Sequence, residues 1–313
     1  MFKLDREIEK ILTAAAEHHV ALPAAPDDWR TLRKAGSAAM ANWAVDAPSY
    51  PDVSSKSWYV MSRDGVSVPV RWYWNATNQS EAAVVYAHGG GMICGSVDLF
   101  EPVIKRYVHE TGVPFLSVDY RLAPEAHGET LAEDVFAALG WLAVNGSSLG
   151  IDPARIALMG DSAGGGIAAG AAILARDRGI AVARQLLIYP MLDDRTQTPA
   201  TELLPYAIWS YDNNYTGWHA LLGDDLGKPI VSSIAAPGRL VDFSGLAPAF
   251  LEVGELDIFR DEVIEFARRL LASAISTELH VYPGAPHGYD LMAPDSELSH
   301  RAMRSRVQAI RSL

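Results

Sequence analysis

Short apolar runs recur at wide intervals from residue 82 onward, and this pattern constrains the fold more than any other feature. In chain order the runs are AAVVYAH, VPFLSVDY, RIALMG, QLLIYP, AFLEVGE and TELHVYP. Helix-length segments such as GETLAEDVFAALGWLAV and DEVIEFARRLLASA separate most of them. Continuous apolar strands that alternate with helices indicate an α/β protein whose parallel sheet is covered on both faces. Upstream, KSWYVMS and VSVPVRWYW predict two further strands joined by the turn RDG.

The stretch between QLLIYP and AFLEVGE does not fit this alternation. It is rich in Trp, Tyr, Pro and paired aspartates, and it is too long for a simple crossover. Long excursions with structure of their own often form lids over a site. The sequence therefore predicts a helical cap made of two short helices in residues 1–45 and the insertion 191–245, above a core of residues 46–190 and 246–313. The alternative left open is a helical insertion far from any site.

The segment IALMGDSAGGGIAAG places a serine between an apolar strand and a helix of small residues. Its frame matches G-x-S-x-G, the nucleophile elbow, a tight turn that exposes the serine: Gly160, Asp161, Ser162, Ala163 and Gly164. The helix N-terminus behind the serine supplies N–H groups and partial positive charge where an oxyanion would form. A phosphate-binding P-loop does not fit because the segment lacks lysine, and a dinucleotide site does not fit because GGGIAA falls inside the helix.

A serine nucleophile needs a base, and in this class of fold the chain order is Ser, then Asp or Glu, then His. The histidines that follow Ser162 are His219, His280, His287 and His300. His219 falls in the insertion, His280 inside a predicted strand and His300 in the C-terminal helix. His287 follows the last predicted strand in the loop YPGAPHGYD, and such sheets place their sites at the carboxyl ends of strands. We therefore predict that His287 is the base.

The acid is expected in the loop that leaves the preceding strand. The segment AFLEVGELDIFRDE offers Glu255, Asp257, Asp261 and Glu262. Asp261 and Glu262 fall in the first turn of the next helix, where carboxylates commonly complement the helix dipole. Asp257 has no such explanation and can reach the His287 loop. We predict that Asp257 orients the imidazole and stabilises the imidazolium, with Glu255 as the second candidate.

With HGGGMICGS, which begins at His88, the chain resembles the hormone-sensitive-lipase-like family of α/β-hydrolase esterases. The resemblance runs from about residue 80 to the end and rests on motifs in matching order and spacing: HGGG (88–91), DYRLAPE (119–125), GDSAGG (160–165), DIFRDE (257–262) and HG (287–288). It implies the α/β-hydrolase fold, with a mostly parallel central sheet flanked by helices and a helical cap. It also implies a serine carboxylesterase.

The same resemblance implies roles for the residues of the HGGG motif. Three consecutive glycines let backbone N–H groups turn toward a reacting carbonyl oxygen. The amides of Gly90, Gly91 and Ala163 would bind the oxyanion. His88 would support this loop and would not act as a second base.

Other motif residues are expected to have structural roles. Arg121 and Glu125 in DYRLAPE are similar to family residues that brace loops near the site. The chain departs from the family at Met92, where an aromatic residue is common, so the acyl pocket is expected to be less sharply shaped. Cys94 is interpreted as a small buried side chain, with a redox-sensitive thiol as the alternative.

Charge and composition restrict the function further. The formal net charge is -12, from 38 acidic and 26 basic residues, which argues against a nucleic-acid partner and against electrostatic attachment to anionic lipid. The single cysteine excludes an intramolecular disulfide and fits a reducing compartment. The N-terminus has no signal-peptide h-region and the chain has no apolar run long enough to span a membrane, so we predict a cytoplasmic protein.

The predicted reaction is the hydrolysis of a short- to medium-chain or small apolar ester through an acyl-enzyme intermediate. No cofactor or metal is expected, because the chain lacks clustered metal ligands. The aromatic residues of the predicted cap either suit an apolar substrate or form the cap's own core: Trp29, Trp43, Trp209, Tyr211 and Trp218. A lactone or amide substrate stays open, and a non-catalytic small-molecule receptor is disfavoured because all three triad residues are present. Many members of the family dimerise, so the resemblance suggests a homodimer.

Overall fold

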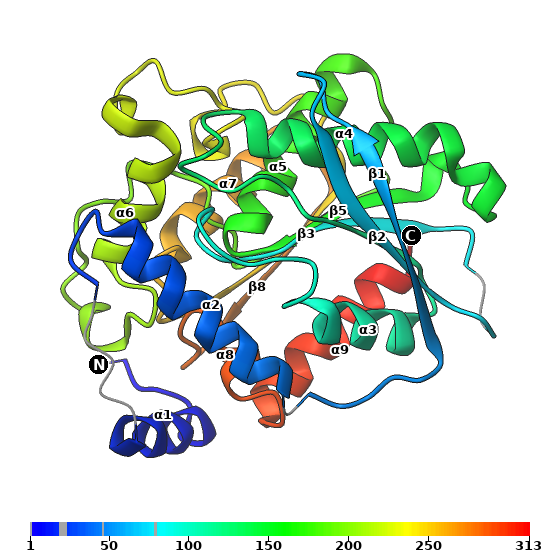
Figure 1. Cartoon of the computed structure of the whole chain (residues 1–313). Coiled ribbons are helices and arrows are strands. Elements are labelled where there is room, and N and C mark those ends of the chain that lie inside the picture. Colours follow the sequence, from blue (N-terminus) through cyan, green and yellow to red (C-terminus); the bar gives the residue numbers. More distant parts are fainter. Residues whose placement is uncertain (1, 19–23, 46, 78–79) are drawn as a thin grey trace.

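The central feature of the fold is one twisted sheet. The computed structural model contains an eight-stranded sheet and describes residues 2–18, 24–45, 47–77 and 80–313 (Figure 1). The strands are β1 (Val53–Met61), β2 (Ser67–Asn75), β3 (Ala83–Ala87), β4 (Phe115–Val118), β5 (Ile156–Asp161), β6 (Gln185–Ile188), β7 (Ala249–Gly254) and β8 (Thr277–Tyr282). Their order across the sheet is β1-β2-β4-β3-β5-β6-β7-β8.

Most strand pairs are parallel, as the apolar runs predict. The hairpin β1–β2 is antiparallel and β2 pairs antiparallel with β4, while every neighbouring pair from β4 to β8 is parallel. Strands β3 to β7 are buried along their whole length, whereas β1 and β8 at the two edges expose part of their residues. The prediction of a mostly parallel α/β sheet is confirmed, and the central strands are buried because helices cover both faces of the sheet.

Two groups of helices cover the sheet. Helices α3 and α9 pack against each other, and α4 packs against α5, which contacts β3, β5 and β6 (Figure 1). Helix α7 lies on β7 and β8. The helices are α1 (Arg6–His18), α2 (Trp29–Val45), α3 (Glu101–Thr111), α4 (Thr130–Asn145), α5 (Ala163–Arg178), α6 (Tyr211–Leu222), α7 (Arg260–Ala272), α8 (Tyr289–Met292) and α9 (Glu297–Arg311). None of these described helices combines the length and apolarity needed to cross a bilayer.

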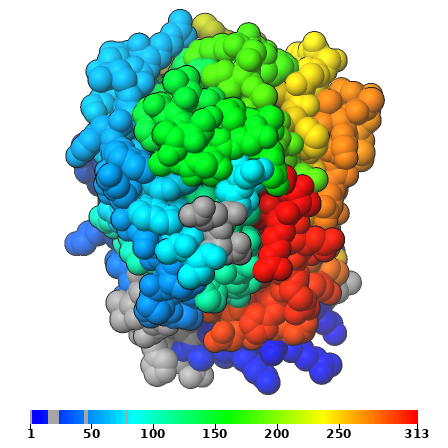
Figure 2. All heavy atoms as spheres, turned by 90° about the vertical axis from the view of Figure 1, so that its right-hand side faces the viewer, coloured from blue at the N-terminus to red at the C-terminus, as the bar shows by residue number. Residues whose placement is uncertain are grey.

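Hydrogen bonds attach the end of the C-terminal helix to the core. Arg155 donates a hydrogen bond of 2.6 Å to the carbonyl oxygen of Leu313, and Arg184 donates one of 3.2 Å to that of Ala309. Figure 2 shows this red segment at the surface directly beside the green middle part of the chain. The end of the chain is thereby fixed to the loops around the start of β5 and β6.

The two N-terminal helices contact different parts of the molecule. Helix α2 packs against α6 of the insertion, and the N–H of Asp27 donates to Thr216 Oγ1 at 2.9 Å (Figure 1). Helix α1 contacts α8, and the N–H of Asp5 donates to the carbonyl oxygen of Gly284 at 2.9 Å. Of the predicted cap and its boundary, residues 1, 19–23 and 46 lie outside the described residues.

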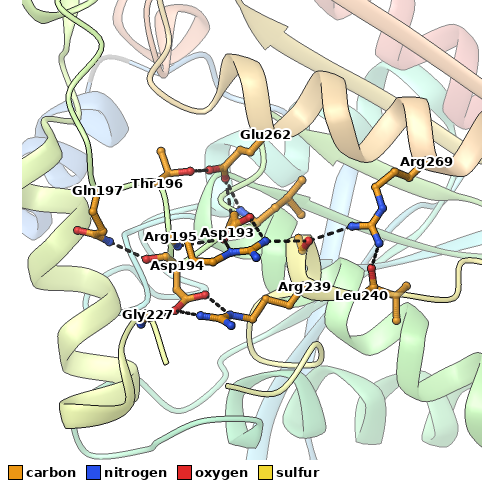
Figure 3. A network of polar contacts seen from close by, with 12 residues as sticks. Asp193, Asp194, Arg195, Thr196, Gln197, Gly227, Arg239, Leu240, Glu262 and Arg269 are labelled. Atoms are coloured by element: carbon orange, nitrogen blue, oxygen red, sulfur yellow. Dashed lines mark hydrogen bonds and ion pairs between the residues drawn. The ribbon is translucent and has the colours of Figure 1, made fainter. Parts of the chain in front are cut away.

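Ionic contacts join the two ends of the insertion (Figure 3). The buried carboxylate of Asp194 pairs with Arg239, at 2.5 Å between Oδ1 and Nε, and accepts a hydrogen bond from the N–H of Gly227 at 2.8 Å. Arg269 of α7 donates to the carbonyl oxygens of Gly238, at 3.1 Å, and of Leu240. The insertion therefore starts and ends at one place on the core.

Candidate active site

Ser162 lies in a strained turn between β5 and α5. Its φ is 56° and its ψ is −121°, a left-handed conformation that is uncommon for a residue with a side chain. A methyl group added at Gly160 would lie 2.2 Å from the carbonyl oxygen of Gly164, and one added at Gly164 would lie 2.1 Å from that of Ala87. Both positions therefore require glycine, which explains the small residues on each side of the serine.

Hydrogen bonds connect the serine to the predicted histidine and acid. Ser162 Oγ lies 2.8 Å from His287 Nε2, and His287 Nδ1 lies 2.7 Å from Asp257 Oδ2. The other oxygen of Asp257, Oδ1, accepts from the N–H of Phe259 at 2.9 Å. Ser162 is 9% exposed, whereas the side chain of Asp257 has no exposed surface. The serine is thus the accessible end of a chain of three groups whose acid is shielded from water.

The structure also distinguishes the two candidate acids. Glu255 Oε2 accepts a hydrogen bond of 3.1 Å from the N–H of Gly284, so this carboxylate fixes the start of the histidine loop. Asp257 alone of the two contacts the imidazole. Each carboxylate therefore has its own partner, and the one bonded to His287 is Asp257.

Two aromatic rings hold the imidazole from the sides. The ring centroid of Tyr189 lies 5.0 Å from that of His287 in an edge-on arrangement, and the centroid of Phe259 lies 5.1 Å away. Tyr189, at the end of β6, has a φ of 36° and is fully buried. These contacts restrict the ring of His287 to the orientation that its two hydrogen bonds require.

A buried network of charges supports the loop that carries His287. Arg306 of α9 pairs with both Asp290 and Glu252, and all three side chains are buried. Tyr189 donates to Asp290 Oδ1 at 2.8 Å, and Tyr289 donates to Glu252 Oε1 at 3.1 Å. Burial raises the pKa of the Glu252 carboxyl. Because Asp290 follows His287 by three positions, the network ties the histidine loop to β7 and to the C-terminal helix.

The residue before the serine is a further buried acid. Asp161 accepts a hydrogen bond of 2.7 Å from the hydroxyl of Tyr86, and burial raises the pKa of this carboxyl to about 7. Its side chain lies in the core beneath the turn and makes no hydrogen bond to Ser162 or His287. Asp161 therefore belongs to the packing of the turn.

Residues 88–94, which we call the glycine loop, follow β3 and lie beside the serine. The carbonyl oxygen of Gly90 accepts hydrogen bonds from the N–H groups of Ile93, at 3.1 Å, and Cys94, at 3.0 Å. Within the described part of the chain, the N–H groups of Gly90 and Gly91 donate to no protein acceptor. A methyl group added at Gly89 would lie 3.5 Å from Cβ of the serine. The loop therefore presents free donors close to the nucleophile.

Ala163, directly after the serine, adds a further donor. It is the first residue of α5, and the first N–H groups of a helix have no acceptor within the helix. The partial positive charge of the helix N-terminus lies at the same place. Ala163 therefore follows Ser162 directly, and the glycine loop that contains Gly90 and Gly91 lies beside the same serine.

His88 is enclosed beneath the glycine loop. Its ring stacks on Tyr120, with centroids 4.3 Å apart, and on Phe100, at 5.6 Å. Its Nδ1 lies 2.8 Å from the carbonyl oxygen of Gly89, and burial lowers the pKa of the imidazole to about 4. The ring is neutral at neutral pH and makes no hydrogen bond to Ser162.

Other predicted residues lie around this loop. Cys94 is buried, its Sγ lies 3.2 Å from the carbonyl oxygen of Gly90, and burial raises the pKa of the thiol to about 12, so the group is a protonated packing element. Arg121 pairs with Asp134 at 2.6 Å. Glu125 pairs with Arg33 of α2 at 2.6 Å and so joins the N-terminal region to the core.

Sequence reasoning missed the residues that support the site from a distance. Arg306, Asp290 and Tyr189 had no motif to mark them. Glu262 was interpreted as a helix-dipole residue, but it is partly buried and accepts from the N–H of Leu192 at 2.6 Å, so it fixes the start of the insertion (Figure 3). The described residues contain no group of three His, Cys, Asp or Glu side chains placed to hold a metal ion.

The fold and the Ser-His-Asp geometry together define an α/β-hydrolase. The family model for the alpha/beta hydrolase fold matches residues 84–291. The carboxylesterase NlhH of Mycobacterium tuberculosis is 39% identical over 232 residues, which cover 72% of each chain. The ethyl acetate hydrolase of Pseudomonas putida is 31% identical over 297 residues, which cover 91% of this chain and 89% of the relative.

A solved structure agrees with these sequence matches. A bacterial heroin esterase superposes with a TM-score of 0.90 at 36% identity, covering 99% of this chain and 98% of the other. The chain therefore belongs to the hormone-sensitive-lipase-like family of α/β-hydrolase esterases. The predicted fold and the resemblance of the motifs are both confirmed.

Proposed function

We propose that the protein hydrolyses carboxylic esters, with Ser162 as nucleophile, His287 as general base and acid, and Asp257 as the group that orients the imidazole. The observation that carries this proposal is the unbroken series of hydrogen bonds from Ser162 Oγ through His287 to Asp257. The names of the relatives, a carboxylesterase, an ethyl acetate hydrolase and a heroin esterase, support it.

The geometry suggests how each group would act. Ser162 Oγ attacks the ester carbonyl while His287 Nε2 takes its proton, and Asp257 stabilises the imidazolium. The N–H groups of Gly90, Gly91 and Ala163 bind the oxygen that becomes negative in the tetrahedral intermediate. His287 then protonates the leaving alcohol, and a water molecule activated by the same imidazole releases the acyl group.

The proposed substrates are short- to medium-chain or small apolar esters. The insertion supports this, because the indole ring of Trp209 lies against Gly91, next to the proposed oxyanion donors. We propose that residues 1–45 and 191–245 form a cap that limits the room for the acyl or alcohol group. A homodimer and a cytoplasmic location stay predictions from the sequence.

The first experiment is the hydrolysis of p-nitrophenyl esters from C2 to C12 by the wild type and by Ser162→Ala. We expect turnover that peaks at short or medium acyl chains and disappears in the variant. Labelling by a fluorophosphonate, detected by mass spectrometry on the peptide that contains Ser162, provides a second readout. Activity that survives in Ser162→Ala would exclude this mechanism.

The same assay separates the alternatives. A lactone or amide hydrolase would label with the fluorophosphonate but would turn over a lactone or anilide series faster than the esters. A non-catalytic receptor would bind small apolar esters without turnover and without labelling. Either result would replace the proposal of ester hydrolysis.

A further inference from the structure

The insertion touches the glycine loop at two points. A methyl group added to Gly91 would lie 2.3 Å from Cη2 of Trp209, so the indole ring rests directly on the backbone of Gly91. A methyl group added to Gly217, in α6, would lie 2.7 Å from the carbonyl oxygen of Gly91. Glycine at position 217 thus lets the helix approach the loop backbone to backbone.

Helix α2 contacts the C-terminal end of the same loop. Arg33 Nε donates to the carbonyl oxygen of Ile93 at 2.6 Å, and Arg33 Nη2 donates to that of Ala123 at 2.7 Å. A methyl group added at Gly36 would lie 2.8 Å from Sγ of Cys94. Helix α2 therefore holds the second half of the glycine loop.

The two elements that hold the loop also hold each other. Besides the bond from Asp27 to Thr216, the carboxylate of Asp27 lies 2.5 Å from Nδ1 of His219 in α6. Helix α2, helix α6 and the glycine loop therefore each contact the other two. Movement of the loop would require one of the two helices to move with it.

This arrangement matters because the loop cannot hold its own shape well. Three consecutive glycines have more backbone freedom than other residues, and the hydrogen bonds within the loop engage the carbonyl oxygens of Gly89 and Gly90 but not the N–H groups of Gly90 and Gly91. The free N–H groups of Gly90 and Gly91 must point at the place where charge develops. Preorganised donors of this kind are effective because they need no reorganisation during the reaction.

We propose that Gly217 and Trp209 are positioning residues, which hold the Gly90 and Gly91 amides in the orientation that binds the oxyanion. The inference rests on the proposed ester hydrolysis and extends it. The proposed cap then has a part in the chemical step as well as in shaping the substrate pocket. Its contacts with Gly91 act on the transition state more than on the bound ester.

The test is Gly217→Ala, assayed with the ester series. The added methyl group would displace Gly91, so we expect kcat to fall about 10- to 100-fold while KM changes less than about threefold. Gly140→Ala is the matched control, because Gly140 lies inside α4 and its added methyl would meet only Ile180 Cδ1, at 3.7 Å. The control is expected to keep the wild-type kcat.

A transition-state analogue gives a second readout. A trifluoromethyl ketone forms a tetrahedral adduct with Ser162 whose oxyanion occupies the place of the reacting oxygen. Its inhibition constant should weaken in Gly217→Ala by the same factor as kcat/KM. If Gly217→Ala changed only the stability of the protein, the inhibition constant would equal that of the wild type.

The outcomes separate the two proposals. Wild-type turnover together with an unimpaired, folded Gly217→Ala would overturn the positioning role alone. Absence of turnover in the wild type would overturn ester hydrolysis and this inference with it. If Gly217→Ala does not fold, Trp209→Ala decides: a lower kcat at similar KM supports the positioning role, and a higher KM at unchanged kcat overturns it.

Discussion

The histidine side and the glycine-loop side of the site are held in place by different means. On the histidine side, charged and phenolic side chains of the core do the holding: Asp257 binds the imidazole, and Arg306, Asp290 and Tyr189 fix the loop that carries it. On the other side, the holding groups come from α2 and from the insertion: Arg33 donates to a backbone carbonyl oxygen of the glycine loop, and Trp209 and Gly217 lie against Gly91.

This difference determines which changes each side tolerates. The histidine side depends on side-chain atoms that are present, so removing atoms or charges damages it. The glycine loop depends in addition on space left free at Gly91 and Gly217, so there adding atoms is damaging as well. The following changes test this contrast.

The largest effect is expected from Asp257→Asn. The amide cannot stabilise the imidazolium and favours the wrong tautomer of His287, so kcat should fall about 10⁴-fold with little change in KM. Glu255→Gln is the matched control, because its oxygen still accepts from the N–H of Gly284. Steady-state kinetics with one ester measure both variants, and equal losses in the two would remove Asp257 from the triad.

The next effect concerns the charge network. Arg306→Met leaves Glu252 and Asp290 buried without their cation, so the free energy of unfolding should fall by about 3–5 kcal/mol. Guanidinium chloride unfolding measures this change. Adding Glu252→Gln and Asp290→Asn to the Met variant should recover part of the loss. A single Arg306→Met variant that unfolds like the wild type would show that the network contributes little.

A smaller effect is the pH dependence that His88 causes beneath the glycine loop. Its pKa is lowered from 6.5 to about 4 in the folded protein, so the unfolded chain binds the extra proton between these values. The contribution of His88 to the free energy of unfolding is fully present above pH 6.5. It falls by on the order of 3 kcal/mol as the pH is lowered toward 4. His88→Phe should flatten the curve of unfolding free energy against pH in this window; a curve parallel to that of the wild type would contradict the buried neutral ring.

The smallest effect is expected for Glu125→Gln on the glycine-loop side. Glu125 is 58% exposed, and its partner Arg33 also donates to the carbonyl oxygens of Ile93 and Ala123. The loss of unfolding free energy should stay below about 1 kcal/mol, with kcat unchanged. Thermal unfolding at low and high salt measures it. A large loss of kcat would mean that the ion pair with Glu125, and not the bonds from Arg33 to the two carbonyl oxygens, holds α2 to the loop.

Features that depend on chain order and local pattern could be predicted from the sequence. The apolar runs predict the strands, and Gly160, Ser162 and Gly164 predict a turn in which only glycines fit beside the serine. His287 follows from its place after the last strand. Carboxyl ends of parallel strands meet at one edge, so these local signals also predict which residues come together.

Features that depend on distant partners could not be predicted. Arg306 is one of several arginines in an amphipathic helix, and its partners lie 16 and 54 positions away in the chain. Glu255 accepts from the N–H of Gly284, 29 positions further along the chain, and no local pattern marks that contact. Glu262 occupies the first turn of a helix, where an exposed and a buried carboxylate give the same sequence pattern.

The ion pair between Asp194 and Arg239 has a consequence for how this enzyme can change over time. It joins positions 45 residues apart, so the span between them forms a closed loop on the core. In such a loop a doubling of length costs only about 0.6 kcal/mol of closure entropy. The span is therefore an exchangeable module: evolution can lengthen, shorten or replace it without rebuilding the catalytic strands, as long as the replacement keeps a small residue against Gly91.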